Sequence, residues 1–302
     1  MYSTEDSIET LRITAPAEFS ERLEFALERL AESSSCWQPA SSDRAVIEAY
    51  FECAEDADRA SVALTAQLME LTGGSSLWSI ERETLPAKDW SNAWKAFFHV
   101  ERVSQRIVTK PTWEPYTPQP GDCVIEIDPG MSFGTGQHET TRGCLRFLDR
   151  LTTGRPQPAS FLDLGCGSGI LSIAAAKLGC RPVRAIDIDE DSVVIAGENI
   201  AANGCAANAT VAVGDVARLA EPQRYDIVAA NILAPVLIEH AAAISDTVAP
   251  GGHLLLAGIL TTQYMDVRSA YLPLGLQECE INAEGEWTSA RWQKPVDGLI
   301  IK

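Results

Sequence analysis

Short apolar runs alternate with amphipathic stretches along the second part of the chain. The apolar runs predict strands at 160–165, 183–188, 209–214, 225–231, 253–259, 276–281 and 287–292. Helical spacing of apolar residues predicts helices at 168–179, 191–203, 234–248 and 262–272. This alternation is typical of an α/β domain with a parallel sheet. No helix is expected between the last two strands, so they should form an antiparallel hairpin that turns at "EGEW", residues 284–287.

Residues 1–86 follow a different pattern. Strands are expected at 7–13, 44–53 and 76–84, with "SSSCWQPAS" at 33–41 as a possible further strand, and helices are expected at 17–33 and 56–72. The second helix should end at Gly73 and Gly74, because glycine commonly terminates helices. The order β-α-β-β-α-β predicts a smaller α+β domain with ferredoxin-like topology.

Residues 87–122 lie between these two regions. Trp90, Trp94, Phe97 and Phe98 are spaced to fall on one side of a short helix, and the proline-rich stretch after Thr109 predicts a linker. The aromatic side chains suit either packing between domains or contact with a substrate. We therefore divide the chain into a domain at 1–86, a helix and linker at 87–122, and a second domain at 123–302.

Length and charge narrow the class of protein. A chain of 302 residues suits two domains, and none of its apolar runs reaches the roughly 18–20 residues of a membrane span. Its acidic, polar start differs from a targeting peptide. A net charge of −18 argues against direct nucleic-acid binding, which needs a basic surface. Residues 1–86 carry 17 acidic and 6 basic residues, which suits either solubility or attraction of a basic macromolecule.

Cysteine and histidine usage gives two further expectations. The eight cysteines form no CxxC pair, which indicates reduced thiols and a cytoplasmic location. The four histidines form no HExxH motif or Cys/His cluster, so we expect no metal site.

A glycine-rich motif follows the first strand of the predicted parallel sheet. In "FLDLGCGSGIL", Gly165, Gly167 and Gly169 follow an apolar strand that contains Asp163 and precede a helix. Glycine lets the backbone approach a ligand closely, and the helix N-terminus adds partly positive N–H groups. The spacing is GxGxG, whereas a pyrophosphate-binding fingerprint has its third glycine one place later. A nicotinamide-dependent oxidoreductase is therefore disfavoured.

Two acidic residues at the end of the next strand are candidates for binding a ribose. Asp187 lies 22 residues after Gly165, where a carboxylate can accept both ribose hydroxyls. Asp189 is the competitor, although it is also placed to cap the following helix. Asp215 follows the third strand, where it suits either an adenine amino group or a turn. The predicted sheet, the glycine-rich loop and the acid placed to bind a ribose together imply S-adenosylmethionine as the ligand. Five parallel strands plus a hairpin match a seven-stranded, Rossmann-like class I methyltransferase sheet.

The fourth strand ends abruptly in a polar residue. Asn231 closes the apolar run "YDIVAAN" and is expected at the crevice where ligands bind, unless it only caps the next helix. Methyltransferases that act on planar amides or adenine carry Asn-Pro-Pro-Tyr here, with a tyrosine that stacks on the substrate. This chain has Asn231, Ile232, Leu233 and Ala234 instead. The absence of an aromatic residue favours an aliphatic amine as methyl acceptor, oriented by the Asn231 side chain and the Ile232 carbonyl.

The motifs taken together resemble a known family. "DPGMSFGTGQHETT" (128–141), "DLGCGSGIL", "AIDIDED", "ANILAPVL", "LLLAGIL" and "EGEW" occur in this order, and the sequence is similar to the bacterial methyltransferases of ribosomal protein L11 over roughly residues 87–302. The resemblance implies an S-adenosylmethionine-dependent protein-lysine N-methyltransferase with a small N-terminal substrate-recognition domain. It implies a basic ribosomal protein as partner, and we expect a monomer.

The resemblance also assigns site residues. Thr141, Gly165, Asp187 and Asn231 are implied to contact S-adenosylmethionine, with the loop 128–141 folded over its methionine end. Thr140 would supply a second hydroxyl, and Phe133 would shield the sulfonium. His138 and Glu139 are candidates for a base or for fixing the loop. The alternatives are methylation of another protein's lysines and a non-catalytic S-adenosylmethionine-binding protein.

Overall fold

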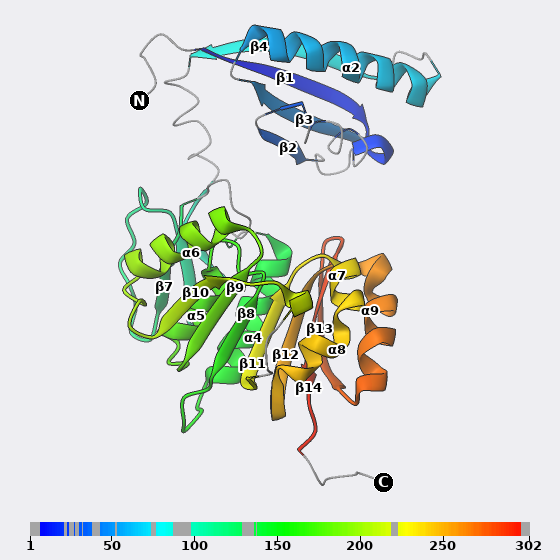
Figure 1. Cartoon of the computed structure of the whole chain (residues 1–302). Helices are drawn as coiled ribbons and strands as arrows, with labels where there is room; N and C mark the ends of the chain where they lie inside the picture. The colour runs from blue at the N-terminus through cyan, green and yellow to red at the C-terminus, as the bar shows by residue number, and fades with distance from the viewer. Residues whose placement is uncertain are drawn as a thin grey trace. The chain divides into compact units, whose positions relative to one another are not determined.

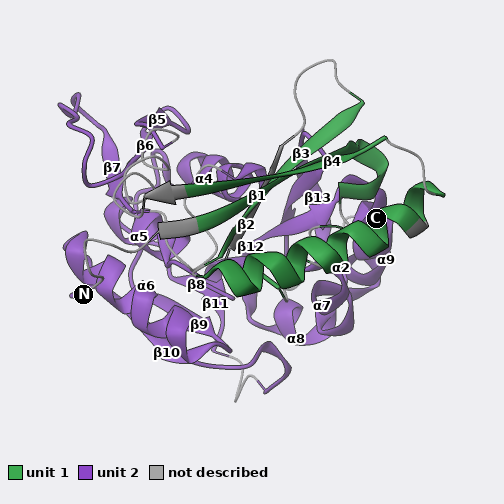
Figure 2. Cartoon of the chain, turned by 90° about the horizontal axis from the view of Figure 1, so that it is seen from above, with its two compact units in different colours: residues 1–97 green, residues 98–302 purple. Residues whose placement is uncertain are grey.

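The structure is a computed structural model that divides into two compact units, residues 1–97 and 98–302 (Figures 1 and 2). It describes residues 7–20, 23, 27, 30, 31, 33–37, 43–51, 53–73, 77–86, 98–128, 136, 138–218 and 223–296. The helix expected near 89–98 falls almost entirely outside the described residues.

Unit 1 contains a four-stranded antiparallel sheet in the order β2-β3-β1-β4. Its elements are β1 Ser7–Pro16, a 3-10 turn at Ala17–Phe19, β2 Ser33–Trp37, β3 Arg44–Phe51, α2 Ala54–Thr72 and β4 Ser79–Pro86. The long helix α2 runs along the sheet (Figure 2). α2 ends at Gly73, whose φ of 60° is the left-handed conformation that glycine adopts most readily.

The core of unit 1 follows from the alternation in its strands. Leu11 and Ile13 of β1 and Ile47 of β3 are fully buried and pack against Leu64 and Leu68 of α2. Leu23 joins this core, as does Leu27, and the two positions lie one helical turn apart in the helix predicted at 17–33. Most of that helix lies outside the described residues.

Unit 2 is built on a seven-stranded sheet in the order β10-β9-β8-β11-β12-β14-β13. Its strands are β8 Phe161–Leu164, β9 Val183–Asp187, β10 Ala209–Val213, β11 Tyr225–Asn231, β12 Val248–Leu260, β13 Gln277–Glu284 and β14 Trp287–Gln293. The first five are parallel, whereas β14 pairs antiparallel with both β12 and β13. The seven strands and the final hairpin predicted from the sequence are confirmed.

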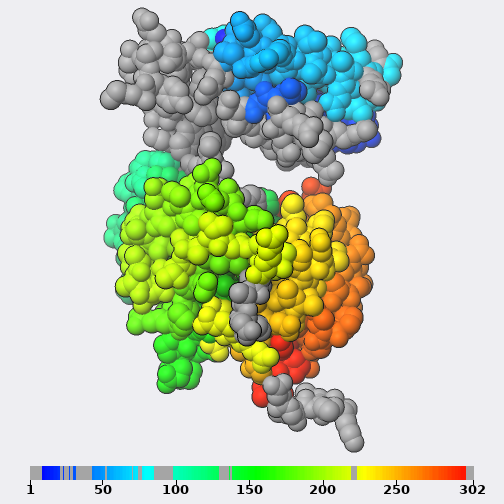
Figure 3. Space-filling model, viewed as in Figure 1, coloured from blue at the N-terminus to red at the C-terminus, as the bar shows by residue number. Residues whose placement is uncertain are grey.

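Helices cover both faces of this sheet. α4 Glu139–Thr152 and α5 Ile170–Lys177 pack on one face, around Phe161, Ile227 and Ala229. α7 Ala234–Glu239, α8 Ala241–Asp246 and α9 Tyr264–Tyr271 pack on the other, around Leu162, Val228 and Ala230. In the space-filling view, the yellow atoms of α7 and α8 and the orange atoms of α9 form one continuous side of the unit (Figure 3). Alternate residues of each strand therefore enter different cores.

Three features of unit 2 differ from the sequence prediction. Residues 98–122 are not simply a linker, because β5 Glu101–Arg102 and β6 Ile107–Lys110 form a small sheet with β7 Cys123–Glu126 within this unit. α4 was not predicted at all. The single helix expected at 234–248 is two helices, which meet at His240.

α4 is held to its surroundings by charged groups that the hydrophobic pattern does not reveal. Asp149 is nearly buried and accepts hydrogen bonds from Ser104 Oγ at 2.6 Å and from Arg106 Nε at 2.6 Å. Burial opposes ionisation of Asp149, but these hydrogen bonds outweigh it and lower the pKa of Asp149. The buried Asp149 carboxylate is therefore fully hydrogen-bonded, and it holds the turn between β5 and β6 against α4.

Candidate active site

The glycine motif forms a loop between β8 and α5 that is tied to the neighbouring strand. The backbone N–H groups of Gly165 and Cys166 donate to the Ile186 carbonyl at 2.9 and 3.0 Å. Gly165, Gly167 and Gly169 have φ values of 68°, 50° and 79°, which residues with a Cβ rarely adopt. The loop thus lies at the carboxyl end of β8 with Gly165 and Gly167 half-buried, the position at which open α/β sheets bind ligands.

Asp187 is the last residue of β9 and lies against this loop. Its carboxylate accepts hydrogen bonds from Gly167 N at 2.8 Å and from Asp189 N at 3.1 Å. The side chain is half-buried and its position is fixed from two sides. A carboxylate held in this way is available to further donors, since each oxygen can accept more than one hydrogen bond.

Asp189, the competing acid, has a structural task. It is the N-cap of α6, Glu190–Ala202, and accepts from Asp191 N, Ser192 N and Ser192 Oγ, the last at 2.7 Å. The hydrogen bonds from Ser192 lower the pKa of Asp189. The two acids are therefore distinguished: Asp189 caps a helix, whereas Asp187 faces the glycine loop.

Asp215 follows β10, as expected, and begins a 3-10 turn at Val216–Arg218. Its carboxylate accepts from Ala217 N at 2.8 Å and lies 3.8 Å from the Arg218 guanidinium. These contacts account for the residue as a turn acid. Binding of an adenine amino group stays a prediction.

The structure brings two predicted cofactor residues together across the sheet. Asn231, the last residue of β11, donates from Nδ2 to Oγ1 of the fully buried Thr141 at 3.4 Å. The Asn231 carbonyl oxygen, Oδ1, is buried and has no hydrogen-bond partner among the described residues. An unsatisfied buried acceptor costs about 1–3 kcal/mol, so this oxygen indicates a place for a donor that a ligand brings.

Ile232 follows Asn231 at a bend in the chain and is half-buried. Its Cγ2 lies so close to Gly165 that a Cβ on that glycine would collide with it. The residue expected to orient the acceptor is thus packed onto the glycine loop, so the two predicted parts of the site are in contact.

The loop 128–141 is described only in part. Phe133 and Gly134 lie outside the described residues, so the predicted shielding role of Phe133 is untested. Gly136 has a φ of 91°, and a Cβ there would lie 3.0 Å from Ile170 Cδ1 and 3.1 Å from Thr109 Cγ2. Glycine at this position therefore allows the loop to pack closely against α5.

His138 ends the loop and begins α4. As the N-cap, its Nδ1 accepts from Thr140 N at 3.3 Å and lies 2.7 Å from Thr140 Oγ1. Its ring also packs edge-on against Trp287, with centroids 5.0 Å apart. Burial lowers the pKa of His138, so the neutral ring that accepts from Thr140 predominates at pH 7. These contacts favour the loop-fixing role over the role of a base.

Trp287 and α4 are the parts of the site that the sequence analysis missed. α4 carries Thr140 and Thr141, and it is fixed to the β13–β14 hairpin by Arg142 and Arg146, which reach Glu284 at 2.8 and 2.5 Å. The signal was present, because apolar residues recur three to four places apart in "ETTRGCLRFLDRLT".

Asp163 lies beneath the glycine loop. It is 1% exposed, and its Oδ2 accepts from Ser172 N at 3.1 Å and from Ser172 Oγ at 2.7 Å. Burial raises the pKa of Asp163 to about 7, against the opposing effect of these two hydrogen bonds. The residue joins β8 to α5 and has no exposed surface for a substrate.

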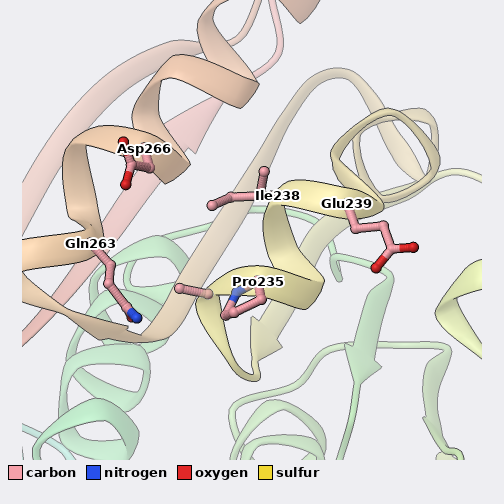
Figure 4. A pocket seen from close by; sticks show the side chains of 6 residues that line it. Pro235, Ile238, Glu239, Gln263 and Asp266 are labelled. Atoms are coloured by element: carbon pink, nitrogen blue, oxygen red, sulfur yellow. The ribbon is translucent and has the colours of Figure 1, made fainter.

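A shallow cavity of about 390 Å³ lies between α7 and the start of α9. Pro235 and Ile238 of α7 form one wall, and Gln263 and Asp266 form the other (Figure 4). None of the predicted site residues lines it.

The sheet with its antiparallel last hairpin, the glycine loop after β8 and the acid at the end of β9 define the class I methyltransferase fold. The family model "Ribosomal protein L11 methyltransferase (PrmA)" matches residues 14–295. The chain belongs to this family, and it is accordingly an enzyme of the S-adenosylmethionine-dependent class.

Individual relatives agree with this assignment. The chain is 44% identical over 212 residues to the ribosomal protein L11 methyltransferase of Geotalea daltonii, which covers 68% of this chain and 67% of that protein. It is 42% identical over 254 residues to that of Geobacter sulfurreducens, covering 82% and 81%. A crystal structure of ribosomal protein L11 methylase from Lactobacillus delbrueckii subsp. bulgaricus has a TM-score of 0.56 at 29% identity, covering 66% of this chain and all of that one.

The described residues include neither a membrane-spanning helix nor a metal-binding cluster. None of the helices there has both the length and the apolar character needed to cross a membrane. No group of three or more His, Cys, Asp and Glu side chains there is arranged to hold a metal ion.

Proposed function

We propose that the protein transfers methyl groups from S-adenosylmethionine to lysine amines of ribosomal protein L11, in the cytoplasm. Family membership supports the substrate, because both relatives described above are named as L11 methyltransferases. The observation that carries the proposal is the buried, unsatisfied Oδ1 of Asn231, which lies beside Thr141. Free thiols at all cysteines whose side chains are described suit a reducing compartment.

The residues present fit S-adenosylmethionine. The glycine loop at Gly165 and Gly167 would receive it, and the Asp187 carboxylate would accept from its ribose hydroxyls. Asp215 would take the adenine amino group. Thr140 and Thr141, which are fully buried, and Asn231 would surround the methionine end, with Phe133 above it. When bound, the cofactor supplies an electrophilic methyl group on a cationic sulfur.

The task of the protein at the acceptor side is to hold a neutral amine in line. A lysine with an ordinary pKa of 10.4 requires about 4.6 kcal/mol for deprotonation at pH 7. Removal of water around the amine reduces this requirement, since desolvation lowers the pKa of a lysine. The Asn231 side chain and the Ile232 carbonyl would each accept an N–H of the amine and so direct its lone pair. The proton of the product amine would pass to solvent.

Aliphatic surroundings at this point support an amine over a planar substrate. Leu233 and Ala234 stand where methyltransferases of planar groups carry an aromatic residue, and Leu233 is exposed. Residues 1–86 would contribute attraction for the protein substrate, because their 17 acidic and 6 basic residues complement a basic ribosomal protein.

Methyl transfer to purified large-subunit proteins tests the proposal. With labelled S-adenosylmethionine we expect label in L11, located on lysine residues by mass spectrometry, and none with the Asp187→Ala variant. Label in a different protein would replace the substrate and keep the chemistry. Cofactor binding without transfer to any ribosomal or cellular protein would instead indicate a non-catalytic binding protein.

A further inference from the structure

The bend at Ile232 lies against a glycine that belongs to the neighbouring strand. β11 and β12 pair in parallel, with Asn231 opposite Ala257, so the next residues along the two strands are Ile232 and Gly258. Gly258 has a φ of 79°. A Cβ on Gly258 would lie 2.8 Å from the carbonyl carbon and 3.1 Å from the amide nitrogen of Ile232, and closer still to the Ile232 carbonyl oxygen.

The three atoms nearest to a Cβ at position 258 all belong to the main chain of Ile232. A flexible side chain can rotate away from a new methyl group, whereas this carbonyl can move only if the bend itself changes its dihedral angles. The missing Cβ therefore permits the present direction of the Ile232 carbonyl. Any other residue at 258 would displace it, in addition to adopting a disfavoured φ.

An irregularity in β12 places Gly258 at this point. Leu256 pairs with Ala290 and Ile259 pairs with Thr288, so Ala257 and Gly258 of β12 stand opposite Ser289 alone. One extra residue in a strand is a β-bulge, and bulges re-aim the chain next to active sites. The bulge is an observation independent of the close approach to Ile232, and both involve the same residue.

Ile232 is held from its other side by Gly165. Its Cγ2 occupies the space that a Cβ on Gly165 would need. The side chain of Ile232 thus rests on one glycine and its backbone on another, which leaves the bend little freedom.

We propose that Gly258 is a positioning residue that sets the direction of the Ile232 carbonyl, and with it the orientation of the acceptor amine. This inference rests on the proposed function of Ile232 and extends it to a residue that does not touch the substrate. It predicts a loss of turnover that is larger than the loss of cofactor affinity, because the glycine loop and Asp187 belong to other strands.

The test compares two glycine substitutions with the same backbone strain. Gly258→Ala introduces the collision, whereas Gly275→Ala has an equivalent φ of 81° but no atom within 4 Å of the new Cβ. For Gly258→Ala we expect kcat to fall about 100-fold, the size of effect that a displacement of about 1 Å can cause, with the Kd for S-adenosylmethionine within about fivefold of wild type. Gly275→Ala should keep wild-type kcat. Wild-type kcat in both variants, or an equal loss in both, overturns the proposal.

The displacement itself can be seen without a substrate. With ¹³C-carbonyl isoleucine and ¹⁵N-leucine, each Ile–Leu pair gives one signal, and the sequence has pairs at 170–171, 232–233 and 259–260. The 232–233 signal should shift in Gly258→Ala and stay in place in Gly275→Ala, with the 170–171 signal as an internal reference. An unshifted signal contradicts the positioning role. Failure of the wild-type enzyme to methylate, with the shift present, would contradict the proposed function instead.

A second pair of variants covers the case in which Gly258→Ala does not fold. Ile232→Gly frees the backbone of the bend, whereas Ile232→Ala removes the side chain but keeps an ordinary backbone. If the direction of the carbonyl matters, kcat should be about tenfold lower in Ile232→Gly than in Ile232→Ala. Equal kcat values in the two variants contradict the proposal.

Discussion

The two halves of the seven-stranded sheet meet at the crevice but hold their site residues differently. On the β8–β9 side, Asp187 already accepts two backbone N–H groups, and the amides of Gly165 and Cys166 are bonded to Ile186. On the β11–β12 side, Asn231 makes one long hydrogen bond, and its Oδ1 has no partner within the described structure.

This difference distinguishes the half of the sheet proposed to bind the cofactor from the half proposed to orient the acceptor amine. The β8–β9 half is hydrogen-bonded without a ligand, so the cofactor binding proposed for it would cost little conformational entropy. In the β11–β12 half, the Asn231 acceptor is unsatisfied among the described residues, and the bend at Ile232 is held by steric contact with Gly165 and Gly258. Of the interactions made there, only those that are stronger in the transition state than in the ground state raise turnover.

The largest effect is expected at Asp187. In Asp187→Ala, the Kd for S-adenosylmethionine should rise by at least about 100-fold, because hydrogen bonds to a charged group contribute about 1.5–3 kcal/mol each and two would be lost. Calorimetric titration measures this directly. An affinity close to wild type would remove Asp187 from the cofactor site.

For Asn231 we expect a larger effect on turnover than on cofactor affinity. In Asn231→Ala we expect kcat to fall about 30- to 100-fold and the cofactor Kd to rise by no more than about tenfold, since the site loses an orienting group while the β8–β9 half stays intact. Steady-state kinetics and titration of the same preparation give both numbers. Asn203→Ala is the control, because Asn203 caps the end of α6 and bonds the Glu126 backbone. Unchanged kinetics in Asn231→Ala would leave Asn231 with a structural role only.

A smaller, pH-dependent effect on the free energy of unfolding is expected from Asp163, which lies in the β8–β9 half of the sheet. Burial raises the pKa of Asp163 to about 7, above the value of about 3.9 in an unfolded chain. Between these two values the native state binds more protons than the unfolded state, so this residue makes the free energy of unfolding fall as pH rises, by about 1 kcal/mol per pH unit. The effect becomes constant about one pH unit above this pKa, where the native carboxylate is almost fully ionised.

Asp163→Asn removes the titrating group and keeps an oxygen that can accept from Ser172. Denaturant titrations of both proteins from pH 5 to pH 8 should show the variant gaining stability relative to wild type up to about one pH unit above the pKa of Asp163. The comparison of slopes removes the contributions of other acids, which are the same in both proteins. Parallel pH profiles would show that Asp163 is ionised throughout.

The sequence supplies site candidates in both halves of the sheet wherever a residue carries a local signal, for a physical reason. Gly165, Asp187 and Asn231 were identifiable because each interrupts or ends an apolar strand, a local signal that fixes its place at the sheet edge. Gly258 has no such signal, since its importance arises from a contact with Ile232, 26 residues earlier in the chain. Contacts of this kind depend on strand pairing, which a single sequence does not display.

The same difference between local signals and long-range contacts explains the two incorrect predictions at the start of unit 2, the linker after Thr109 and the missing helix α4. Prolines between 111 and 120 indicated a linker, yet β6 pairs with β7 and Asp149 binds Arg106, both through residues far apart in sequence. α4 was missed because its first turn is part of a polar, glycine-rich motif that suggested a loop. The N-terminal strands were found because unit 1 alternates apolar and polar residues in long, regular runs.

The smallest effect is expected at Asp189, which lies two residues from Asp187. Asp189→Ala removes the N-cap of α6 but leaves the backbone N–H that donates to Asp187 Oδ1. We therefore expect unit 2 to melt about 2–4 °C lower, as is usual for the loss of a helix cap, with a cofactor Kd within about twofold of wild type. Asp189→Asn, which can still cap the helix, should melt close to wild type. A large loss of cofactor affinity in Asp189→Ala would mean that α6 must be capped for the β8–β9 half to bind, and that this half is less independent of its helices than its hydrogen bonds indicate.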